Sequence, residues 1–301
     1  MILIFILYAL LALSFVIAKA AVLTAKPIFL IAVRMILAGG ILLSYLKIFH
    51  KTKFSIAKTD IKSFLSVALF HIYLAFIPEF WALQYLTSSK TNIIYSITPF
   101  VSAFIAYYFY GQTLTRRKKV GMFLGVLAIL PVLVAQYNPT EGASLFKFSL
   151  AEVALLIAVV SAAYAWFIIS DLMAKNYSLV LINGAAMLIG GFWALLTSFI
   201  FEIIPAYARG FGVASPPLIN NFYAFGFWVL LLILISNVIV YNLYGLLIKK
   251  YSITFLTLAG FLCPAFGAIL GYFIMGEPIT WHYIISLITI TIALYVYNVR
   301  D

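Results

Sequence analysis

The sequence predicts an all-helical integral membrane protein, on the grounds of its composition, its long apolar runs and the charges between them. Of 301 residues, 66% are hydrophobic and only 9% are charged, and the mean hydropathy is +1.15. Soluble globular domains carry roughly a quarter charged residues. The net charge of +11 is divided among short segments between apolar runs, which argues against a nucleic-acid-binding face.

Ten stretches are long and apolar enough to cross a bilayer, which takes about 20 mostly apolar residues per helix. The first lacks a basic segment and a small-residue cleavage site, so we expect a retained span and not a cleaved signal peptide. The predicted spans are 2–23, 28–48, 63–86, 91–110, 120–137, 150–173, 179–201, 223–247, 252–274 and 280–299.

The loop charges predict the orientation, because cytoplasmic loops are enriched in lysine and arginine. With the N-terminus in the cytoplasm, the opposite side holds only Lys26, Lys90, Lys147 and Arg209. The cytoplasmic side then holds Lys47, Lys51, Lys53, Lys58, Lys62, Arg116, Arg117, Lys118, Lys119, Lys175, Lys249, Lys250 and Arg300. We therefore expect a multi-pass protein of a bacterial inner membrane with both termini in the cytoplasm.

An internal repeat emerges when the chain is compared with itself at an offset of 165 residues. Five residues coincide with identical ones: Pro99, Ala103, Tyr107, Gly111 and Thr115 with Pro264, Ala268, Tyr272, Gly276 and Thr280. Five spans per half make the two halves inverted, and inverted repeats are typical of secondary transporters. We expect one repeat at 1–137, a connecting loop at 138–149 and a second repeat at 150–301.

Each half also carries a proline, an apolar stretch and a Gly-x-x-x-Thr motif before its last span. The motif is Gly-Gln-Thr-Leu-Thr at 111–115 and Gly-Glu-Pro-Ile-Thr at 276–280. Together with Arg34 in span two and Ala-Leu-Gln-Tyr at 82–85, this pattern resembles the drug/metabolite transporters of the EamA type. The resemblance implies a ten-helix carrier whose central cavity is lined by spans 1, 3, 4, 6, 8 and 9.

The stretch Pro-Glu-Phe-Trp-Ala-Leu-Gln-Tyr at 78–85, with Lys19 and Arg34, most resembles exchangers of S-adenosylmethionine and S-adenosylhomocysteine from intracellular bacteria. This narrower resemblance implies uptake of S-adenosylmethionine in exchange for S-adenosylhomocysteine. The family also carries amino acids and other metabolites, and a fold does not name its substrate. An amino acid, especially an aromatic one, is therefore the alternative.

Glu79 is a carboxylate inside span three, where an ionisable group is costly unless it faces a partner or a water-filled cavity. On the predicted topology, Lys19 and Arg34 lie at a similar depth. Two interpretations stay open. Glu79 binds a cationic group of the substrate while Lys19 or Arg34 binds a carboxylate, or Glu79 forms a buried salt bridge with one of these cations.

Span eight places Asn237, Tyr241 and Tyr244 on one helix face. They form either a wall of the cavity or hydrogen bonds between helices. Tyr95 in span four is a further candidate for contact with a substrate.

Three more side chains have two interpretations each. Trp81 and Trp166 either stack on a flat substrate ring or belong to an interfacial belt. His71 is expected to be a hydrogen-bonded core residue, with a proton relay as the alternative.

No motif for catalysis or cofactor binding is found, neither a phosphate loop nor an HExxH helix nor a nucleophile triad. One cysteine and three scattered histidines give no metal-binding spacing. We expect no enzymatic activity, metal or cofactor, and the expected partners are a small metabolite and the lipid bilayer, not nucleic acid. The sequence leaves the oligomeric state open and is compatible with a monomer. A membrane enzyme or non-transporting scaffold is the remote alternative.

Overall fold

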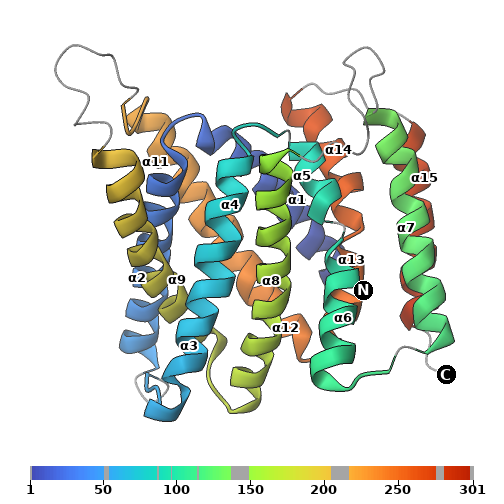
Figure 1. Cartoon of the computed structure of the whole chain (residues 1–301), viewed down its shortest axis with the longest axis horizontal. Helices are drawn as coiled ribbons and strands as arrows, with labels where there is room; N and C mark the ends of the chain where they lie inside the picture. Colours follow the sequence, from blue (N-terminus) through green and yellow to red (C-terminus); the bar gives the residue numbers. More distant parts are fainter. Residues whose placement is uncertain are drawn as a thin grey trace.

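The computed structural model describes residues 2–50, 54–86, 88–95, 97–113, 115–136, 149–204, 217–275 and 281–298, and these residues form helices joined by short turns (Figure 1). Within these ranges the only β pairing is one isolated bridge between Ala25 and Ile219. The all-helical prediction is therefore confirmed. The connecting loop, apart from its last residue, and the second motif at 276–280 lie outside the described residues.

Seven helical stretches are long and apolar enough to cross a membrane: Ile2–Val22, Pro27–Phe49, Lys58–Ala82, Leu150–Ala174, Leu179–Ile203, Phe222–Ile248 and Ile253–Ile274. The three other predicted spans also coincide with helices. The elements, with π-helical segments at η3, η5 and η6, are α1 (Ile2–Val22), α2 (Pro27–Phe49), η2 (Lys58–Asp60), α3 (Ile61–Val67), η3 (Ala68–Tyr73), α4 (Leu74–Ala82), α5 (Ser88–Tyr95), α6 (Thr98–Tyr110), α7 (Arg116–Gln136), α8 (Leu150–Ala174), α9 (Leu179–Ser198), η5 (Phe199–Ile203), α11 (Phe222–Leu232), η6 (Ile233–Val240), α12 (Tyr241–Ile248), α13 (Ile253–Ala259), α14 (Leu262–Met275) and α15 (Trp281–Asn298).

The helices lie side by side as one bundle (Figure 1). The pair α2 and α9 packs at one edge and the pair α7 and α15 at the other, while α4 packs on α8 between them. α1 crosses the interior, where it contacts α11, η6 and α14. The residues of α1, α4, α8 and α12 that face inward are consequently brought near one another.

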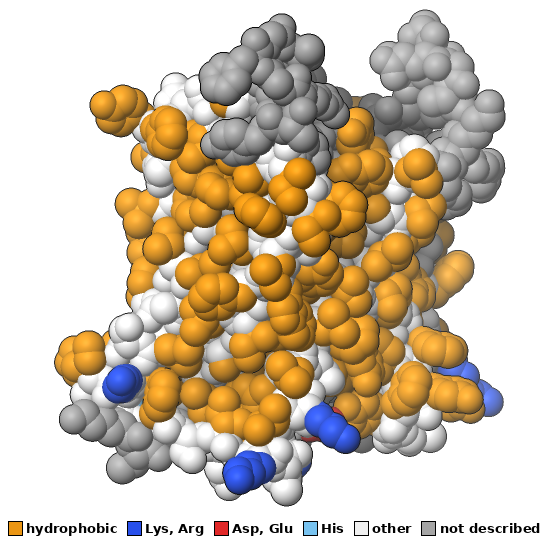
Figure 2. Space-filling model, turned by 60° about the vertical axis from the view of Figure 1, so that its left-hand side comes forward, with side chains coloured by type: hydrophobic (Ala, Val, Ile, Leu, Met, Phe, Trp, Pro, Cys, Tyr) orange, Lys and Arg blue, Asp and Glu red, His pale blue; other side chains and the backbone are white. Residues whose placement is uncertain are grey.

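The outer surface is apolar over most of its height, as the face in Figure 2 shows. Large hydrophobic side chains such as Phe201 and Tyr223 are exposed, which favours contact with lipid and not water. The Lys and Arg side chains visible in Figure 2 gather at the lower edge. Exposed Lys47 and Lys62 lie at the end where α2 ends and α3 begins. This is a multi-pass membrane protein.

Local capping explains where several helices begin. Ser149 and Glu152 form a reciprocal capping box at the start of α8, which satisfies two backbone donors. α2 begins at Pro27, and the carboxylate of Glu202 accepts hydrogen bonds from the backbone N–H groups of Ile28 and Phe29, at 3.0 and 2.7 Å. Glu202 therefore ties the end of one span to the start of α2.

Two predicted spans are broken, and at the repeat offset of 165 the two breaks fall within one residue of each other. α5 ends at Tyr95 before α6 begins at Thr98, and α13 ends at Ala259 before α14 begins at Leu262. The Thr98 hydroxyl donates to the backbone carbonyl of Tyr95. At the other break the Tyr8 hydroxyl donates to a backbone carbonyl of α13. Side chains thus satisfy backbone groups that a membrane interior cannot hydrate.

Spans three and eight each contain a π-helical segment, η3 and η6, which begin at residues 68 and 233. These positions are separated by the same 165 residues as the sequence repeat. π-Helical turns are rare and occur frequently at functional sites. Both segments lie next to residues predicted to face the cavity.

Two adjacent glycines in α2 provide a matched test of how closely α2 packs on α9. A Cβ on Gly39 would lie 2.6 Å from the backbone nitrogen of Leu188 in α9, whereas a Cβ on Gly40 meets nothing within 4 Å. Backbone cannot rotate away from such a contact, so Gly39→Ala is expected to destabilise the fold by about 1–3 kcal/mol. Gly40→Ala should leave the melting temperature in detergent unchanged or raise it slightly, because alanine favours helices. Equal melting temperatures for the two variants would contradict the close packing of α2 on α9.

Candidate functional site

A central cavity of about 140 Å³ lies between the two halves of the bundle. One water needs only about 15 Å³ on the same measure, so the cavity has room for a larger guest. Spans 1, 3, 4, 6, 8 and 9 all contribute to its lining, and Arg34 of α2 joins them. We call this space the central cavity.

The two halves line the central cavity at equivalent positions. Residues from spans three and four pair with residues from spans eight and nine at an offset of 165. The first set is His71, Ala75, Phe76, Glu79, Tyr95 and Thr98, and the second set is Ser236, Val240, Tyr241, Tyr244, Gly260 and Cys263. α1 and α8 contribute in the same way at an offset of 148: Ser14, Phe15 and Ala18 with Ala162, Ala163 and Trp166. The lining is therefore similar in position but different in chemistry between the halves.

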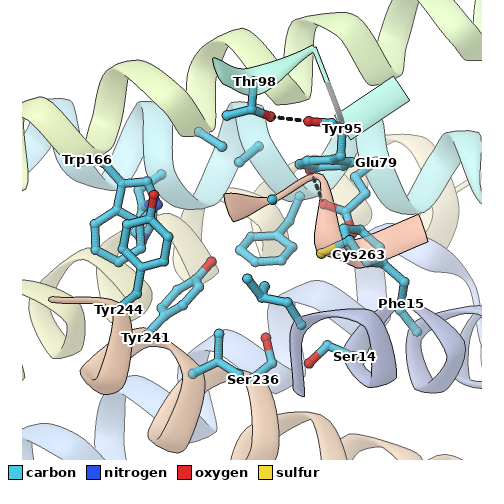
Figure 3. Close-up of a pocket in the computed structure, with 18 of the residues that line it drawn as sticks. Ser14, Phe15, Glu79, Tyr95, Thr98, Trp166, Ser236, Tyr241, Tyr244 and Cys263 are labelled. Carbon is cyan, nitrogen blue, oxygen red and sulfur yellow. Dashed lines mark hydrogen bonds between the residues drawn. The ribbon is translucent and has the colours of Figure 1, made fainter. Parts of the chain in front are cut away.

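One side of the central cavity holds a buried carboxylate. Glu79 is only 6% exposed, and the Tyr95 hydroxyl donates a hydrogen bond to its Oε2 at 2.5 Å. Figure 3 shows both side chains on the same side of the cavity. Within the described part of the chain, no ion pair joins Glu79 to Lys19 or Arg34. The buried salt bridge considered from the sequence is not formed.

Arg34 is 1% exposed and is held by side chains of η6. Its Nε donates to Oδ1 of Asn237 at 2.7 Å, and its Nη2 donates to Oγ of Ser236 at 2.8 Å. The guanidinium carbon lies 4.9 Å from the centre of the Phe76 ring, a cation–π distance. These two hydrogen bonds leave Nη1 for another partner. Asn237 positions Arg34 and does not line the cavity itself.

Lys19 and Trp81 lie away from the cavity lining. Lys19 Nζ donates to the backbone carbonyls of Leu83 and Leu86, at 2.5 and 2.9 Å, and so ties α1 to the end of span three. Trp81 packs on a separate small apolar cluster and lies 5.1 Å from the ring of Tyr85. The depth predicted for Lys19 and the closeness of Trp81 to Glu79 in the sequence therefore do not bring either side chain into the cavity.

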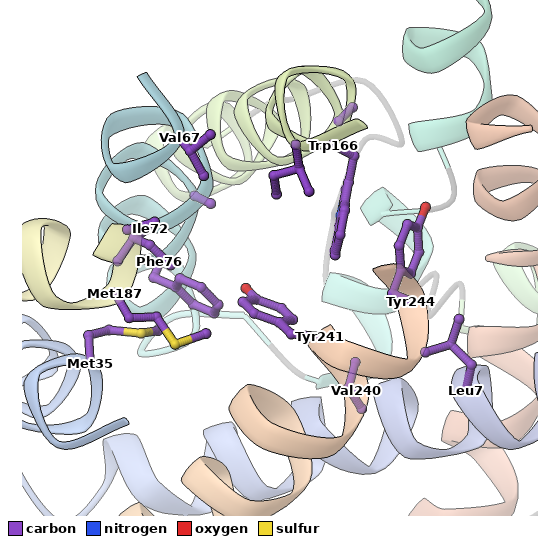
Figure 4. Packing of buried hydrophobic residues seen from close by; sticks show 14 of the residues in the cluster. Leu7, Met35, Val67, Ile72, Phe76, Trp166, Met187, Val240, Tyr241 and Tyr244 are labelled. Carbon is purple, nitrogen blue, oxygen red and sulfur yellow. The ribbon is translucent and has the colours of Figure 1, made fainter. Parts of the chain in front are cut away.

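The opposite side of the central cavity is aromatic. The rings of Trp166 and Tyr244 stack with centroids 4.1 Å apart, and the Tyr241 ring lies 5.9 Å from Trp166. Figure 3 shows these three rings together, across the cavity from Glu79 and Tyr95. In Figure 4 the Phe76 ring lies between Tyr241 and the methionines Met35 and Met187. The cavity thus has one polar side and one aromatic side.

Several lining residues were not singled out from the sequence, among them Phe15, Phe76 and Ser236. The repeat offset of 165 residues could have identified Phe76 as a lining residue, since Phe76 is the counterpart of Tyr241. Ser236 is the counterpart of His71 in the same way. Phe15 carried no such signal, because its contact with Tyr95, at 4.9 Å between ring centroids, depends on how α1 crosses the bundle.

The described residues that line the cavity do not provide a cluster of metal-ligating side chains. Among the described residues, no group of three or more His, Cys, Asp or Glu side chains is close enough to hold an ion. Its polar groups are instead a carboxylate, a guanidinium, hydroxyls and an imidazole. Such groups can recognise a ligand that has both charges and an aromatic ring.

Comparisons with known proteins agree with a carrier. The model of the EamA-like transporter family matches residues 1–134 and 149–299. The S-adenosylmethionine/S-adenosylhomocysteine transporter of Chlamydia muridarum is 29% identical over 266 residues, which cover 88% of this chain and 80% of that protein. The transporter of the same name from Chlamydia trachomatis serovar L2 is also 29% identical, over 88% of this chain and 78% of that protein.

A more distant relative and a solved structure extend the comparison. The uncharacterised transporter YoaV of Bacillus subtilis is 23% identical over 64% of this chain and 66% of its own length. One protein crystal structure superposes with a TM-score of 0.66, covering 98% of this chain and 94% of its own, at 13% identity. At that identity the structural likeness shows the fold alone.

Proposed function

Because the chain belongs to the EamA-like transporter family, we propose that it takes up S-adenosylmethionine in exchange for S-adenosylhomocysteine by alternating access. The family and its named relatives are transporters, so the protein is a transporter and not an enzyme. Its substrate is a small molecule that crosses a membrane. The relatives named for these two metabolites support the substrate assignment.

The observation that carries the proposal is the two-sided central cavity. S-adenosylmethionine has an amino acid at one end and an adenine at the other, with a sulfonium between them. Glu79 and Arg34 supply opposite charges for the amino and carboxylate groups. Trp166, Tyr241 and Tyr244 supply faces for a flat ring, and aromatic faces also attract a sulfonium, at about 0.5–2 kcal/mol per contact. Tyr95 holds the carboxylate of Glu79.

Three further residues act behind this lining. Asn237 orients Arg34, Lys19 ties α1 to span three, and Trp81 packs the end of the same span. We assign them to supporting the site and not to contact with substrate.

The architecture that suits this mechanism is ten spans in two inverted repeats, 1–137 and 150–301, joined by the loop at 138–149. The equivalent helix breaks, π-helical segments and lining positions support it, since carriers of this kind bind substrate at the interface of their repeats. We also propose that the protein lies in a bacterial inner membrane with both termini in the cytoplasm, as the distribution of lysine and arginine between the loops supports. We propose a monomer that needs no cofactor and binds no nucleic acid.

Alternating access also needs contacts between the halves that can break. At the end rich in lysine, Asp60 accepts hydrogen bonds from Lys175 at 2.6 Å and from the Tyr177 hydroxyl at 2.8 Å. The Tyr110 hydroxyl donates to Asp171 at 2.7 Å. Each contact joins the first half to the second. The Lys175 side chain is 55% exposed, and ion pairs with an exposed partner are weak enough to open during a cycle.

Counterflow tests the proposal directly. Proteoliposomes preloaded with S-adenosylhomocysteine are expected to accumulate labelled S-adenosylmethionine, because outward movement of one molecule drives inward movement of the other. Empty liposomes and vesicles preloaded with buffer are the controls. No accumulation above these controls would refute the assigned exchange.

The alternative substrate is an aromatic amino acid, which the same carboxylate, guanidinium and rings would also suit. A thermal-shift panel separates the two, because a ligand stabilises the folded protein according to its concentration and affinity. Stabilisation by tryptophan or tyrosine, without stabilisation by S-adenosylmethionine, would favour the alternative.

A further inference from the structure

We propose that His71 is the specificity-determining residue that hydrogen-bonds the heteroaromatic ring of the substrate on the aromatic side of the central cavity. This assignment deepens the proposed function and rests on it. His71 lies in the π-helical segment η3 and lines the cavity. Among the described residues that line the cavity, His71 is the one whose buried side-chain polar atoms have no hydrogen-bond partner.

The two ring nitrogens of His71 make no hydrogen bond within the described part of the protein. The side chain is 2% exposed, yet neither Nδ1 nor Nε2 has a hydrogen-bond partner among the described residues. The sequence-based expectation of a hydrogen-bonded core histidine is therefore wrong. A buried polar atom without a partner is costly, and buried groups of this kind are rare enough to need an explanation. A ligand in the cavity supplies one.

The surrounding rings hold the imidazole in one orientation. Its ring stacks on Tyr241 with centroids 4.6 Å apart and meets the edge of Trp166 at 4.7 Å. No charged side chain of the described residues is bonded to it. The residue is therefore a fixed imidazole among the same rings that we assign to stacking on the substrate.

The residue at the equivalent position of the second half has a different hydrogen-bonding role, which makes the site asymmetric. The counterpart of His71 is Ser236, whose hydroxyl accepts a hydrogen bond from Arg34. Ser236 is thus occupied in holding the cation, whereas His71 remains available. This difference separates a charged side that binds the amino-acid end from an aromatic side that reads a ring.

The chemistry of the imidazole suits a purine. Neutral histidine offers one donor and one acceptor, and an adenine edge presents a ring-nitrogen acceptor beside an exocyclic amino donor. A phenyl ring offers neither group, an indole offers only an N–H donor, and a phenol offers a single hydroxyl. His71 would consequently favour adenine-containing substrates most strongly over amino acids whose ring has no polar atom.

The test measures counterflow of labelled S-adenosylmethionine and its inhibition by two fragments, adenosine and methionine. His71→Phe keeps a flat ring and removes both nitrogens, and it is expected to weaken inhibition by adenosine about tenfold, the value of roughly one hydrogen bond. Inhibition by methionine should stay within about twofold of wild type. His71→Asn, which restores a donor and an acceptor, should recover most of the adenosine inhibition. His50→Phe, at an exposed histidine outside the cavity, should leave the inhibition by both adenosine and methionine unchanged.

The possible results distinguish a failure of the proposed transport function from a failure of the role assigned to His71. Wild-type protein that does not move S-adenosylmethionine would refute the proposed function and this assignment with it. Wild-type transport with unchanged adenosine inhibition in His71→Phe would refute the role of His71 alone. Equal weakening of both fragments would show a structural role and would also overturn the assignment. If His71→Phe does not yield folded protein, His71→Leu, which also removes both nitrogens, replaces it with the same expected and contradicting outcomes, and His71→Asn remains the variant expected to recover inhibition by adenosine.

Discussion

Replacing Glu79 with glutamine is expected to reduce transport severely while leaving the protein folded. The amide oxygen of glutamine can still accept the hydrogen bond that the Tyr95 hydroxyl gives to Glu79. No ion pair to Lys19 or Arg34 is lost, because none joins them to Glu79 in the described part of the chain. The substrate's cationic group, however, loses a charged partner, which is worth about 1.5–3 kcal/mol, or roughly 10- to 100-fold in KM.

The measurement compares uptake with thermal stability in detergent for the same preparation. Tyr95→Phe is the matched variant, since it removes the hydroxyl but keeps the carboxylate of Glu79. We expect Tyr95→Phe to transport better than Glu79→Gln at a similar melting temperature. Normal uptake by Glu79→Gln would exclude a charge contact with substrate, and a large loss of stability in this variant would instead indicate that the carboxylate supports the fold.

Replacing Arg34 with methionine is expected to damage both the fold and transport. Methionine keeps much of the side-chain volume but leaves Oδ1 of Asn237 and Oγ of Ser236 without their donor. Each buried group without its partner costs about 1–3 kcal/mol. The contact of the guanidinium with the Phe76 ring is lost as well. The melting temperature should therefore fall clearly, and uptake should be lost.

Two further variants show whether this effect depends on the geometry of Arg34. Arg34→Lys keeps the positive charge but not the planar fork that reaches two acceptors, so we expect intermediate stability and weak uptake. Lys62→Met removes a cation from the exposed end of the bundle and should change stability by no more than about 0.5 kcal/mol. A melting temperature for Arg34→Met equal to that of Lys62→Met would contradict the buried network.

The sequence alone was enough to predict the helical membrane fold, because hydrophobic length and loop charge act locally and need no knowledge of packing. It also identified Glu79, Arg34, Tyr95, Trp166, Tyr241 and Tyr244, all of which line the central cavity. An ionisable or ring-bearing side chain inside an apolar span is visible from composition. The repeat offset was visible for the same reason.

Only the tertiary structure decided which of these groups meet. Glu79, Lys19 and Arg34 were expected at one depth, but helix rotation gives each a different partner: a tyrosine hydroxyl, backbone carbonyls and the side chains of η6. At the break between α13 and α14, likewise, a carbonyl of α13 accepts a hydrogen bond from the distant side chain of Tyr8. The imidazole of His71 has no hydrogen-bond partner among the described residues, because the side chains packed on it from other spans place no donor or acceptor within reach. Which polar atoms remain unpaired depends on this packing and cannot be read from the sequence.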